Sequence, residues 1–341
     1  MTVPERPLTF VQAINEALHQ AMANDPTVIV LGEDVAGGGG RKAQGIEDAW
    51  GGILGATRGL IGRFGAERVI DTPISEAGFV GMAVGAAATG LRPVVDLMFM
   101  DFLGVCLDPL LNQAAKLRYM FGGKVKVPLV VRTIMGAGLR AAAQHSQSLH
   151  GLTTAIPGLK TVVPANARDA KGLLLAAIAD DDPVVFCEPK TLYFAATDVP
   201  EEAYTIPLGR AAIARAGDAI TIVGIGKTVE TAIAAADILG QEGIGAEVVD
   251  PRTLSPFDEE TLLTSLAKTG YLVVADEAPP RCGLAADIAA IAVDKGFDLL
   301  RGPIKRVTAP HTPVPFSPVL EDAYLVSAER IAAAARAALE T

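Results

Sequence analysis

Hydrophobic positions along the chain follow two periodicities in turn. Residues 9–23 have the apolar spacing of an amphipathic helix, and residues 27–34, TVIVLGED, form a short apolar run that ends in glycine and acids, as a buried strand does. Strand-like and helix-like segments then alternate, which predicts a mostly parallel sheet covered by helices on both faces. Further strands are expected in RVIDT, PVVDLMF, PLVVRT, KTVVP and PVVFCEP, and further helices at 75–89, 104–120 and 170–179.

A second set of α/β elements begins at AITIVGIG, residues 219–226. The segment before it, 191–209, is irregular and carries Pro200 and Pro207, so it is interpreted as a connector. The 341 residues suit two domains of roughly 150 residues each. We therefore predict an α/β protein whose two domains each contain a mostly parallel sheet. The predicted parts are a first domain at 1–190, a connector at 191–209 and a second domain at 210–341 that serves assembly.

The second domain repeats the pattern of the first. Strands are expected in AEVVD and YLVVADE, and helices at 228–241, 258–268, 284–295 and the C-terminus. The proline-rich stretch 310–318 cannot be helix interior, because proline lacks the amide donor and clashes with the preceding turn. It is predicted to be an extended strap.

Charge and composition exclude several classes of function. A net charge of -10 would repel nucleic-acid phosphates, so no nucleic-acid partner is expected. The apolar run 78–90 is shorter than the roughly 20 residues that cross a bilayer, and the start MTVPERPLTF does not read as a signal peptide. No membrane span and a cytoplasmic location are expected. Cys106, Cys187 and Cys282 lie far apart without zinc spacing and are predicted to be buried thiols.

Two glycine-containing segments resemble nucleotide-binding motifs. TIVGIGKT, residues 221–228, places Gly-Lys-Thr after a strand, but Thr221 stands where a P-loop has its first glycine. A closely packed strand-to-helix turn is the better interpretation, and a P-loop ATPase that binds nucleotide at Lys227 remains an alternative. The run GGGG at 37–40 leads into polar residues, so it predicts a mobile loop and not a dinucleotide fingerprint.

A glutamate stands at the head of a helix rich in small residues. In DTPISEAGFVGMAVGAAATG, residues 71–90, Pro73 and Ser75 predict a helix start directly before Glu76. Alanine and glycine at 77, 81, 85 and 88 form a stripe along which another helix or backbone could approach closely. By spacing alone, a solvated glutamate that complements the helix dipole is the simpler interpretation, and a buried functional carboxyl is the alternative.

Several longer motifs resemble one family along essentially the whole chain. They are LGEDV, DTPISEAGFVGMAVGAA, GLRPVVDLMFMDF, AAAQHSQS, PGLKTVVP, DPVVFCEPK and VVDPRTLSPFD. The chain resembles the beta subunits of the transketolase-like, thiamine-diphosphate-dependent first component of 2-oxo acid and acetoin dehydrogenase complexes. The resemblance implies an oxidoreductase subunit that acts with an alpha subunit, in an assembly of two alpha and two beta chains.

The resemblance assigns roles to individual residues. Glu76 would hydrogen-bond the aminopyrimidine ring of thiamine diphosphate, stabilising the tautomer that takes a proton from the thiazolium carbon. Phe102 would place its ring against that aminopyrimidine, and Ile74 would add apolar contact. His145 would face the substrate and the incoming lipoyl group. Without the resemblance, Phe102 reads as a core residue and His145 as a hydrogen-bonded structural histidine.

Metal ions enter the interpretation in two ways. The family can hold a structural potassium ion, and Leu129, Asp180 and Asp182 occupy the matching positions. Single-chain enzymes that use this cofactor bind its diphosphate through magnesium, with a Gly-Asp-Gly segment followed by Asn. This chain has no Gly-Asp-Gly and no asparagine after Asn166. The magnesium ligands are therefore expected to come from the alpha subunit.

The substrate is the least determined part of the interpretation. Residues 48–60, 112–124 and 310–322 look closest to acetoin dehydrogenases, with pyruvate or branched-chain 2-oxo acid dehydrogenases as the alternative. The chain is expected to help cleave the small-molecule substrate and pass the acyl or aldehyde unit to a lipoyl-bearing dihydrolipoamide acyltransferase. A non-catalytic scaffold subunit, which binds only that transferase, is a competing hypothesis.

Overall fold

The computed structural model describes residues 6–37, 51–52 and 54–340. Contacts divide the chain into two units. Unit 1 comprises Met1–Ile134, Leu152–Glu188 and Leu192–Leu208, and unit 2 comprises Met135–Gly151, Pro189–Thr191 and Gly209–Thr341. The sequence placed the first domain at 1–190, whereas the contacts group residues 135–151 and 189–190 of that range, and residue 191 of the predicted connector, with unit 2.

Unit 1 is built around a sheet whose strands run in the order β6-β7-β5-β4-β2-β3. The pairs β2 with β3, β2 with β4, β4 with β5, and β6 with β7 are parallel. The strands are β2 (Val28–Gly32), β3 (Val69–Asp71), β4 (Arg92–Phe99), β5 (Val130–Met135), β6 (Lys160–Val162) and β7 (Val184–Pro189), and β1 (Pro7–Thr9) pairs antiparallel with β8 (Ala196–Asp198). The expected parallel sheet is confirmed.

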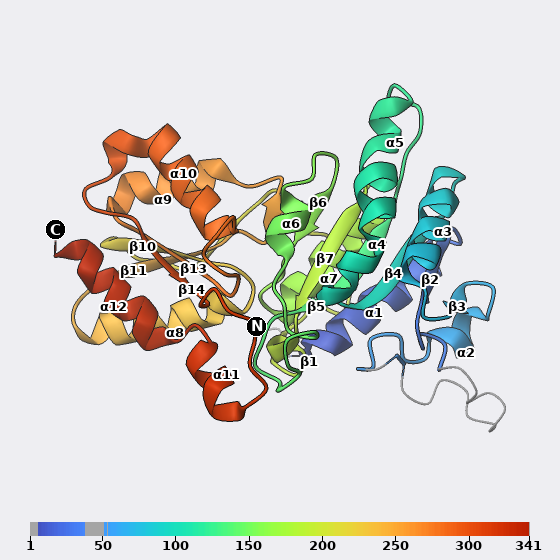
Figure 1. Ribbon diagram of the computed structural model, residues 1–341, viewed down its shortest axis with the longest axis horizontal. Coiled ribbons are helices and arrows are strands. Elements are labelled where there is room, and N and C mark those ends of the chain that lie inside the picture. Colours follow the sequence, from blue (N-terminus) through green and yellow to red (C-terminus); the bar gives the residue numbers. More distant parts are fainter. Residues whose placement is uncertain (1–5, 38–50, 53, 341) are drawn as a thin grey trace. The chain divides into compact units, whose positions relative to one another are not determined.

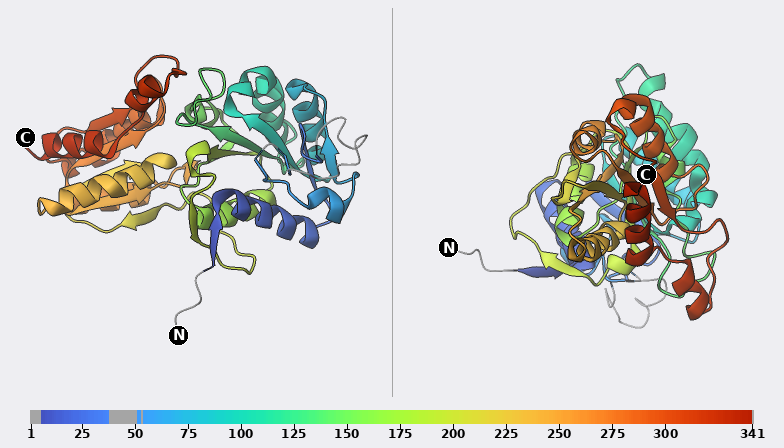
Figure 2. Two further views of the ribbon diagram at one scale, coloured as in Figure 1. Left: turned by 90° about the horizontal axis from the view of Figure 1, so that it is seen from below. Right: turned by 90° about the vertical axis from the view of Figure 1, so that its left-hand side faces the viewer.

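Helices lie on both faces of this sheet (Figures 1 and 2). Helix α1 packs against α7 on one face, while α3 and α4 lie on the other. Helix α1 begins where predicted, because Thr9 and Gln12 form a capping box at its N-terminus. The helices are α1 (Phe10–Asn24), α2 (Leu60–Phe64), α3 (Glu76–Ala88), η2 (Met100–Phe102), α4 (Leu103–Asp108), η3 (Pro109–Ala114), α5 (Ala115–Met120), α6 (His150–Thr154), α7 (Ala167–Ala179) and η4 (Lys190–Leu192).

The single helix predicted near 104–120 is broken into α4, η3 and α5. Pro109 begins the η3 segment, which has π-helical hydrogen bonding, and Cys106 departs from helical geometry with a φ of -112°. Proline removes an amide donor from the helix interior, so a change of hydrogen-bonding pattern at this position has a direct cause.

The expected connector is partly ordered against unit 1. The fully buried Lys171 of α7 donates from Nζ to the carbonyl oxygens of Pro200, Glu201 and Glu202, at 2.6, 3.0 and 2.9 Å, and to Glu16 at 2.6 Å. Lys171, which the sequence pattern would place on a helix surface, therefore holds residues 200–202 against unit 1.

Unit 2 contains a sheet with the strand order β14-β13-β10-β11-β9. Strand β9 is antiparallel to β11, and the remaining pairs are parallel. Helices α8 and α12 lie on one face and α9 and α10 on the other (Figure 1). The elements are β9 (Ala212–Arg215), β10 (Ile220–Gly224), α8 (Lys227–Gln241), β11 (Ala246–Asp250), β12 (Thr253–Ser255), α9 (Glu259–Thr269), β13 (Leu272–Asp276), α10 (Leu284–Gly296), η5 (Phe297–Leu299), β14 (Lys305–Thr308), α11 (Pro318–Tyr324) and α12 (Ala328–Leu339).

Two expectations about the chain's surface can be compared with the structure. Within the described residues, no helix is both long and apolar enough to span a bilayer. Cys106 and Cys187 are buried as expected, but Cys282 is exposed. The prediction for Cys282 was wrong because this residue lies in the turn before α10, with a φ of +52°, and not in a packed element. Most of the glycine-rich loop 37–55 lies outside the described residues.

Candidate functional site

The predicted glutamate lies at the carboxyl edge of the unit 1 sheet. Strand β3 ends at Asp71, a short turn follows, and Glu76 is the first residue of α3. Only 8% of Glu76 is exposed, so the structure favours a carboxyl group shielded from water over a solvated first-turn glutamate. The neighbouring Ser75 makes no side-chain capping bond to this helix.

Glu33 is a second carboxyl at this edge that the sequence analysis did not single out. It follows β2, within the LGEDV motif. Burial first, and then the charges of Glu76, Asp34 and Asp96, raise the pKa of Glu33 above its ordinary value. Because the carboxyl ends of parallel strands meet at one edge of a sheet, the position of Glu33 directly after β2 was the available signal.

Aromatic and apolar side chains lie beyond the same strand ends. Phe102 is half-buried at the end of η2, and its ring meets the ring of Phe99 edge-on, with centroids 6.0 Å apart. Ile74 is 84% exposed in the single chain. Cys106 is close enough to Glu76 for that charge, after burial, to contribute to raising the pKa of its thiol to about 12. Such a thiol stays protonated and is not a nucleophile.

These residues fit the pyrimidine half of a thiamine diphosphate site. Among the described residues, Glu33 Oε1 and Thr72 Oγ1 are buried without a hydrogen-bond partner, and unsatisfied polar atoms of this kind are typical of a ligand-binding edge. Glu76 could bond the ring, and the exposed Ile74 and half-buried Phe102 could contact its faces. Within the described part of the chain, no cluster of three or more His, Cys, Asp or Glu side chains could hold a metal ion.

The face of α3 that carries the small residues is largely exposed within the described residues. The buried face of α3 includes Phe79, Val80, Ala83, Val84 and Ala87. Ala77, Gly85 and Ala88 are exposed, and a Cβ added at Gly85 would meet nothing within 4 Å. Met82 on the same helix is 51% exposed. This part of α3 can therefore be approached closely by another chain.

His145 belongs to unit 2, whereas Glu76, Ile74 and Phe102 belong to unit 1. It lies half-buried in the loop between β5 and α6. Lys190 Nζ donates a hydrogen bond to the main-chain oxygen of His145, and the His145 amide lies 3.5 Å from the oxygen of Ala142. The loop that carries this histidine is thus tied to unit 2.

The residues predicted for potassium already have partners within the chain. Lys160 Nζ lies 2.7 Å from both carboxylate oxygens of Asp180 and 3.3 Å from Asp182, which also pairs with Arg118. The main-chain oxygen of Leu129 accepts from the amide of Val184 at 2.8 Å. Side-chain cations therefore pair with both carboxylates in the structure, and the potassium site stays a prediction.

The P-loop-like turn after β10 is a packed strand-to-helix connection. Thr228 Oγ1 accepts from the amide of Ile225 at 2.7 Å and lies 2.7 Å from the oxygen of Ala275. A Cβ added at Gly224 would come within 2.7 Å of the main-chain oxygen of Thr228. Lys227 pairs with Glu230 at 2.7 Å. The glycine here permits close packing, which supports the interpretation from sequence.

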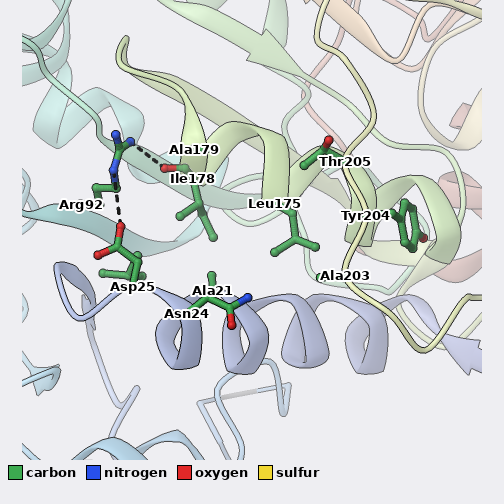
Figure 3. A pocket seen from close by; sticks show the side chains of 11 residues that line it. Ala21, Asn24, Asp25, Arg92, Leu175, Ile178, Ala179, Ala203, Tyr204 and Thr205 are labelled. Carbon is green, nitrogen blue, oxygen red and sulfur yellow. Dashed lines mark hydrogen bonds and ion pairs between the residues drawn. The ribbon is translucent and has the colours of Figure 1, made fainter.

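Unit 1 also contains a pocket of about 470 Å³ between α1, α7 and the segment 203–205 (Figure 3). Its charged end is Arg92, which pairs with Asp25 at 3.7 Å and donates to the oxygen of Ile178 at 3.0 Å. The remaining lining is largely apolar, with Leu175 and Tyr204 among it. None of the predicted site residues lines this pocket.

The two sequence halves each match a known domain. Residues 6–195 match the family described as Transketolase, pyrimidine binding domain, and residues 209–331 match Transketolase, C-terminal domain. The chain is thus a two-domain protein of the transketolase class. A solved structure described as a split gene transketolase, inactive beta4 tetramer, has the same fold, with a TM-score of 0.75, 24% identity and 98% of each chain covered.

Similar proteins show to which family within the transketolase class the chain belongs. The chain is 60% identical to the acetoin:2,6-dichlorophenolindophenol oxidoreductase subunit beta of Bacillus subtilis (strain 168), covering 96% of this chain and 95% of that protein. The subunit of that description from Cupriavidus necator is 56% identical over 97% of each chain. The pyruvate dehydrogenase E1 component subunit beta of Bacillus subtilis is 41% identical over 98% and 99%. The chain belongs to the family of acetoin and pyruvate dehydrogenase beta subunits, as its motifs predicted.

Proposed function

We propose that this chain is the beta subunit of a thiamine-diphosphate-dependent enzyme that oxidatively cleaves acetoin. The identities of 60% and 56% to beta subunits of acetoin oxidoreductases, against 41% to a pyruvate dehydrogenase beta subunit, carry this choice of substrate. The product would pass as an acyl or aldehyde unit to a lipoyl group on an acyltransferase partner. Pyruvate is the alternative substrate.

The residues of unit 1 supply half of the cofactor site in this proposal. When bound, thiamine diphosphate supplies the carbon nucleophile that attacks the substrate carbonyl. Glu76 holds or shares a proton at the aminopyrimidine ring, which a carboxyl shielded from water does more readily than a solvated one. Phe102 and Ile74 contact the ring and exclude water from it. His145, which belongs to unit 2, would face the substrate and the incoming lipoyl group.

An alpha subunit supplies the other half. Its ligands would bind magnesium and the diphosphate, since the described residues of this chain offer no group of three or more His, Cys, Asp or Glu side chains that could hold a metal ion. The largely exposed, small-residue face of α3 and the 84% exposed Ile74 support a partner at this edge. We place the chain in an assembly of two alpha and two beta subunits, with each cofactor between an alpha and a beta chain.

Calorimetry with thiamine diphosphate and magnesium tests this division of the site. The beta chain alone should show no magnesium-dependent binding, and the co-purified alpha and beta chains should bind the cofactor. The assembled enzyme should then reduce 2,6-dichlorophenolindophenol with a higher kcat/KM for acetoin than for pyruvate. Magnesium-dependent binding by the beta chain alone would contradict the half-site, and a preference for pyruvate would favour the alternative substrate.

A further inference from the structure

The loop that carries His145 is held by a buried lysine. Lys190 lies directly after β7 and is only 2% exposed. Its Nζ donates to the main-chain oxygen of His145 and lies 3.3 Å from Ser146 Oγ. Two consecutive residues of the loop, one of them the histidine itself, are therefore bonded to one ammonium group.

A second anchor holds the first part of the same loop. The fully buried Glu321 of α11 accepts from the amide of Gly138 at 2.7 Å, from the amide of Arg140 at 3.1 Å and from the Arg140 guanidinium at 2.6 Å. Arg140 and Ala142 have φ values of +55° and +59°. Residues other than glycine keep such conformations only where their surroundings enforce them, so the loop depends on these outside contacts.

The chemistry of lysine explains what the first anchor does. A buried ammonium group is costly unless its donors are bonded, and Lys190 directs two of them at His145 and Ser146. Because the bond is made to the main-chain oxygen of His145, it determines where the Cα of that residue lies and therefore where the imidazole begins. A displacement of about 1 Å in such a group can cost about a hundredfold in rate.

We infer that Lys190 is a positioning residue for His145, because its buried ammonium group fixes the backbone from which the imidazole projects. The kinetic part of this inference rests on the proposed function, in which His145 faces the substrate. The structural part does not, since the loop and its anchors all belong to unit 2 of this chain.

Lys227 provides a matched control. The charges of both Lys227 and Lys190 lower the pKa of the buried Glu277, against the larger effect of burial. Lys227 pairs with Glu230 at 2.7 Å and makes no bond to the histidine loop within the described residues. Lys227→Met therefore removes a charge that acts on Glu277 in the same direction but leaves the loop anchored, and Lys190→Arg retains a cationic donor.

Hydrogen exchange of the full beta chain tests the structural part. Peptides that cover 136–149 should exchange about tenfold faster in Lys190→Met than in the wild type, because a bond to a charged donor is lost. Lys190→Arg and Lys227→Met should exchange as the wild type does. Equal exchange in Lys190→Met and the wild type would overturn the inference, whatever the enzyme's activity. If Lys190→Met does not fold, Lys190→Gln takes its place under the same criteria.

A double-mutant cycle in the assembled enzyme tests the kinetic part. Lys190→Met should lower kcat/KM for acetoin about tenfold to a hundredfold without changing thiamine diphosphate affinity, and should add nothing in the His145→Ala background. Losses that add independently in the double variant would overturn the positioning role. A wild-type enzyme that does not oxidise acetoin would contradict the proposed function, and the exchange experiment would still decide the role of Lys190 in the loop.

Discussion

His150 Nε2 lies 3.1 Å from Asp276 Oδ1, and both side chains are buried in unit 2. Burial disfavours a charged imidazole, but the charge and hydrogen bond of Asp276 outweigh it and raise the pKa of His150. Glu277 follows Asp276 in the sequence, and its carboxyl is buried. Its Oε2 has no hydrogen-bond partner among the described residues. Burial and the charge of Asp276 raise the pKa of Glu277 to about 7.

This carboxyl should make unit 2 less stable as pH rises. The pKa of Glu277 is higher in the folded chain than its ordinary value of 4.5, so its favourable contribution is present below 4.5 and is lost as pH rises through about 7. His150 acts in the same direction, since its folded pKa is also raised. The effect of Glu277→Gln on the free energy of unfolding should therefore be more favourable at pH 8 than at pH 5.5, by about 2 kcal/mol.

Urea denaturation followed by circular dichroism at the two pH values measures this difference. Glu260→Gln is the control, because its side chain is 84% exposed in the same unit. That substitution should change stability equally little at both pH values. A Glu277→Gln variant whose stability relative to the wild type is the same at pH 5.5 and pH 8 would show that Glu277 titrates normally.

Sequence patterns predicted both mostly parallel sheets, because alternating apolar runs and amphipathic segments are typical of a parallel sheet covered by helices. They missed β14, whose residues KRVT are half charged, and the break at Pro109, where tertiary packing tolerates a proline inside a helical run. Glu76 was predicted as a site residue from its motif. Glu33 and Lys190 were not, because their roles depend on neighbours 43 and 45 residues away along the chain, Glu76 and His145.

Unit 1 contains a buried ion network, and removing any one of its partners should destabilise the chain strongly. The Arg132 guanidinium, 2% exposed, donates to both oxygens of the fully buried Glu188 at 2.7 and 3.0 Å and to Asp96 at 3.1 Å. Tyr193 also donates to Glu188. Glu188→Gln would leave Arg132 buried with half of its countercharge, which should cost about 3 to 5 kcal/mol.

Chemical denaturation of Glu188→Gln against Glu242→Gln measures this cost. Glu242 accepts from Arg336 through both oxygens in a similar bidentate arrangement, but both side chains are more than one-third exposed. Water screens such a pair, so the control should be close to the wild type. If both variants lost a similar free energy of unfolding, burial would not be the cause of the large contribution expected for the Glu188 interaction.

The last prediction concerns Glu76, which unit 1 presents at the carboxyl edge of its sheet. In the assembled enzyme, Glu76→Gln should keep the fold and bind thiamine diphosphate with near-normal affinity, because an amide matches the carboxyl in shape. It should lose about a hundredfold or more in the rate of proton exchange at the thiazolium carbon, because an amide cannot relay a proton. Rapid-quench exchange in deuterium oxide, read by NMR, measures that rate independently of substrate oxidation.

Glu33→Gln is the informative comparison for this experiment. The charge of Glu76 helps to raise the pKa of Glu33, so removing the charge of Glu33 alters the electrostatics around Glu76 without replacing the predicted proton carrier. If Glu76 alone contacts the aminopyrimidine, Glu33→Gln should retain measurable exchange while Glu76→Gln loses it. Wild-type exchange in Glu76→Gln would remove this residue from the proposed chemistry, and an equal loss in both variants would mean that the two carboxyls act together.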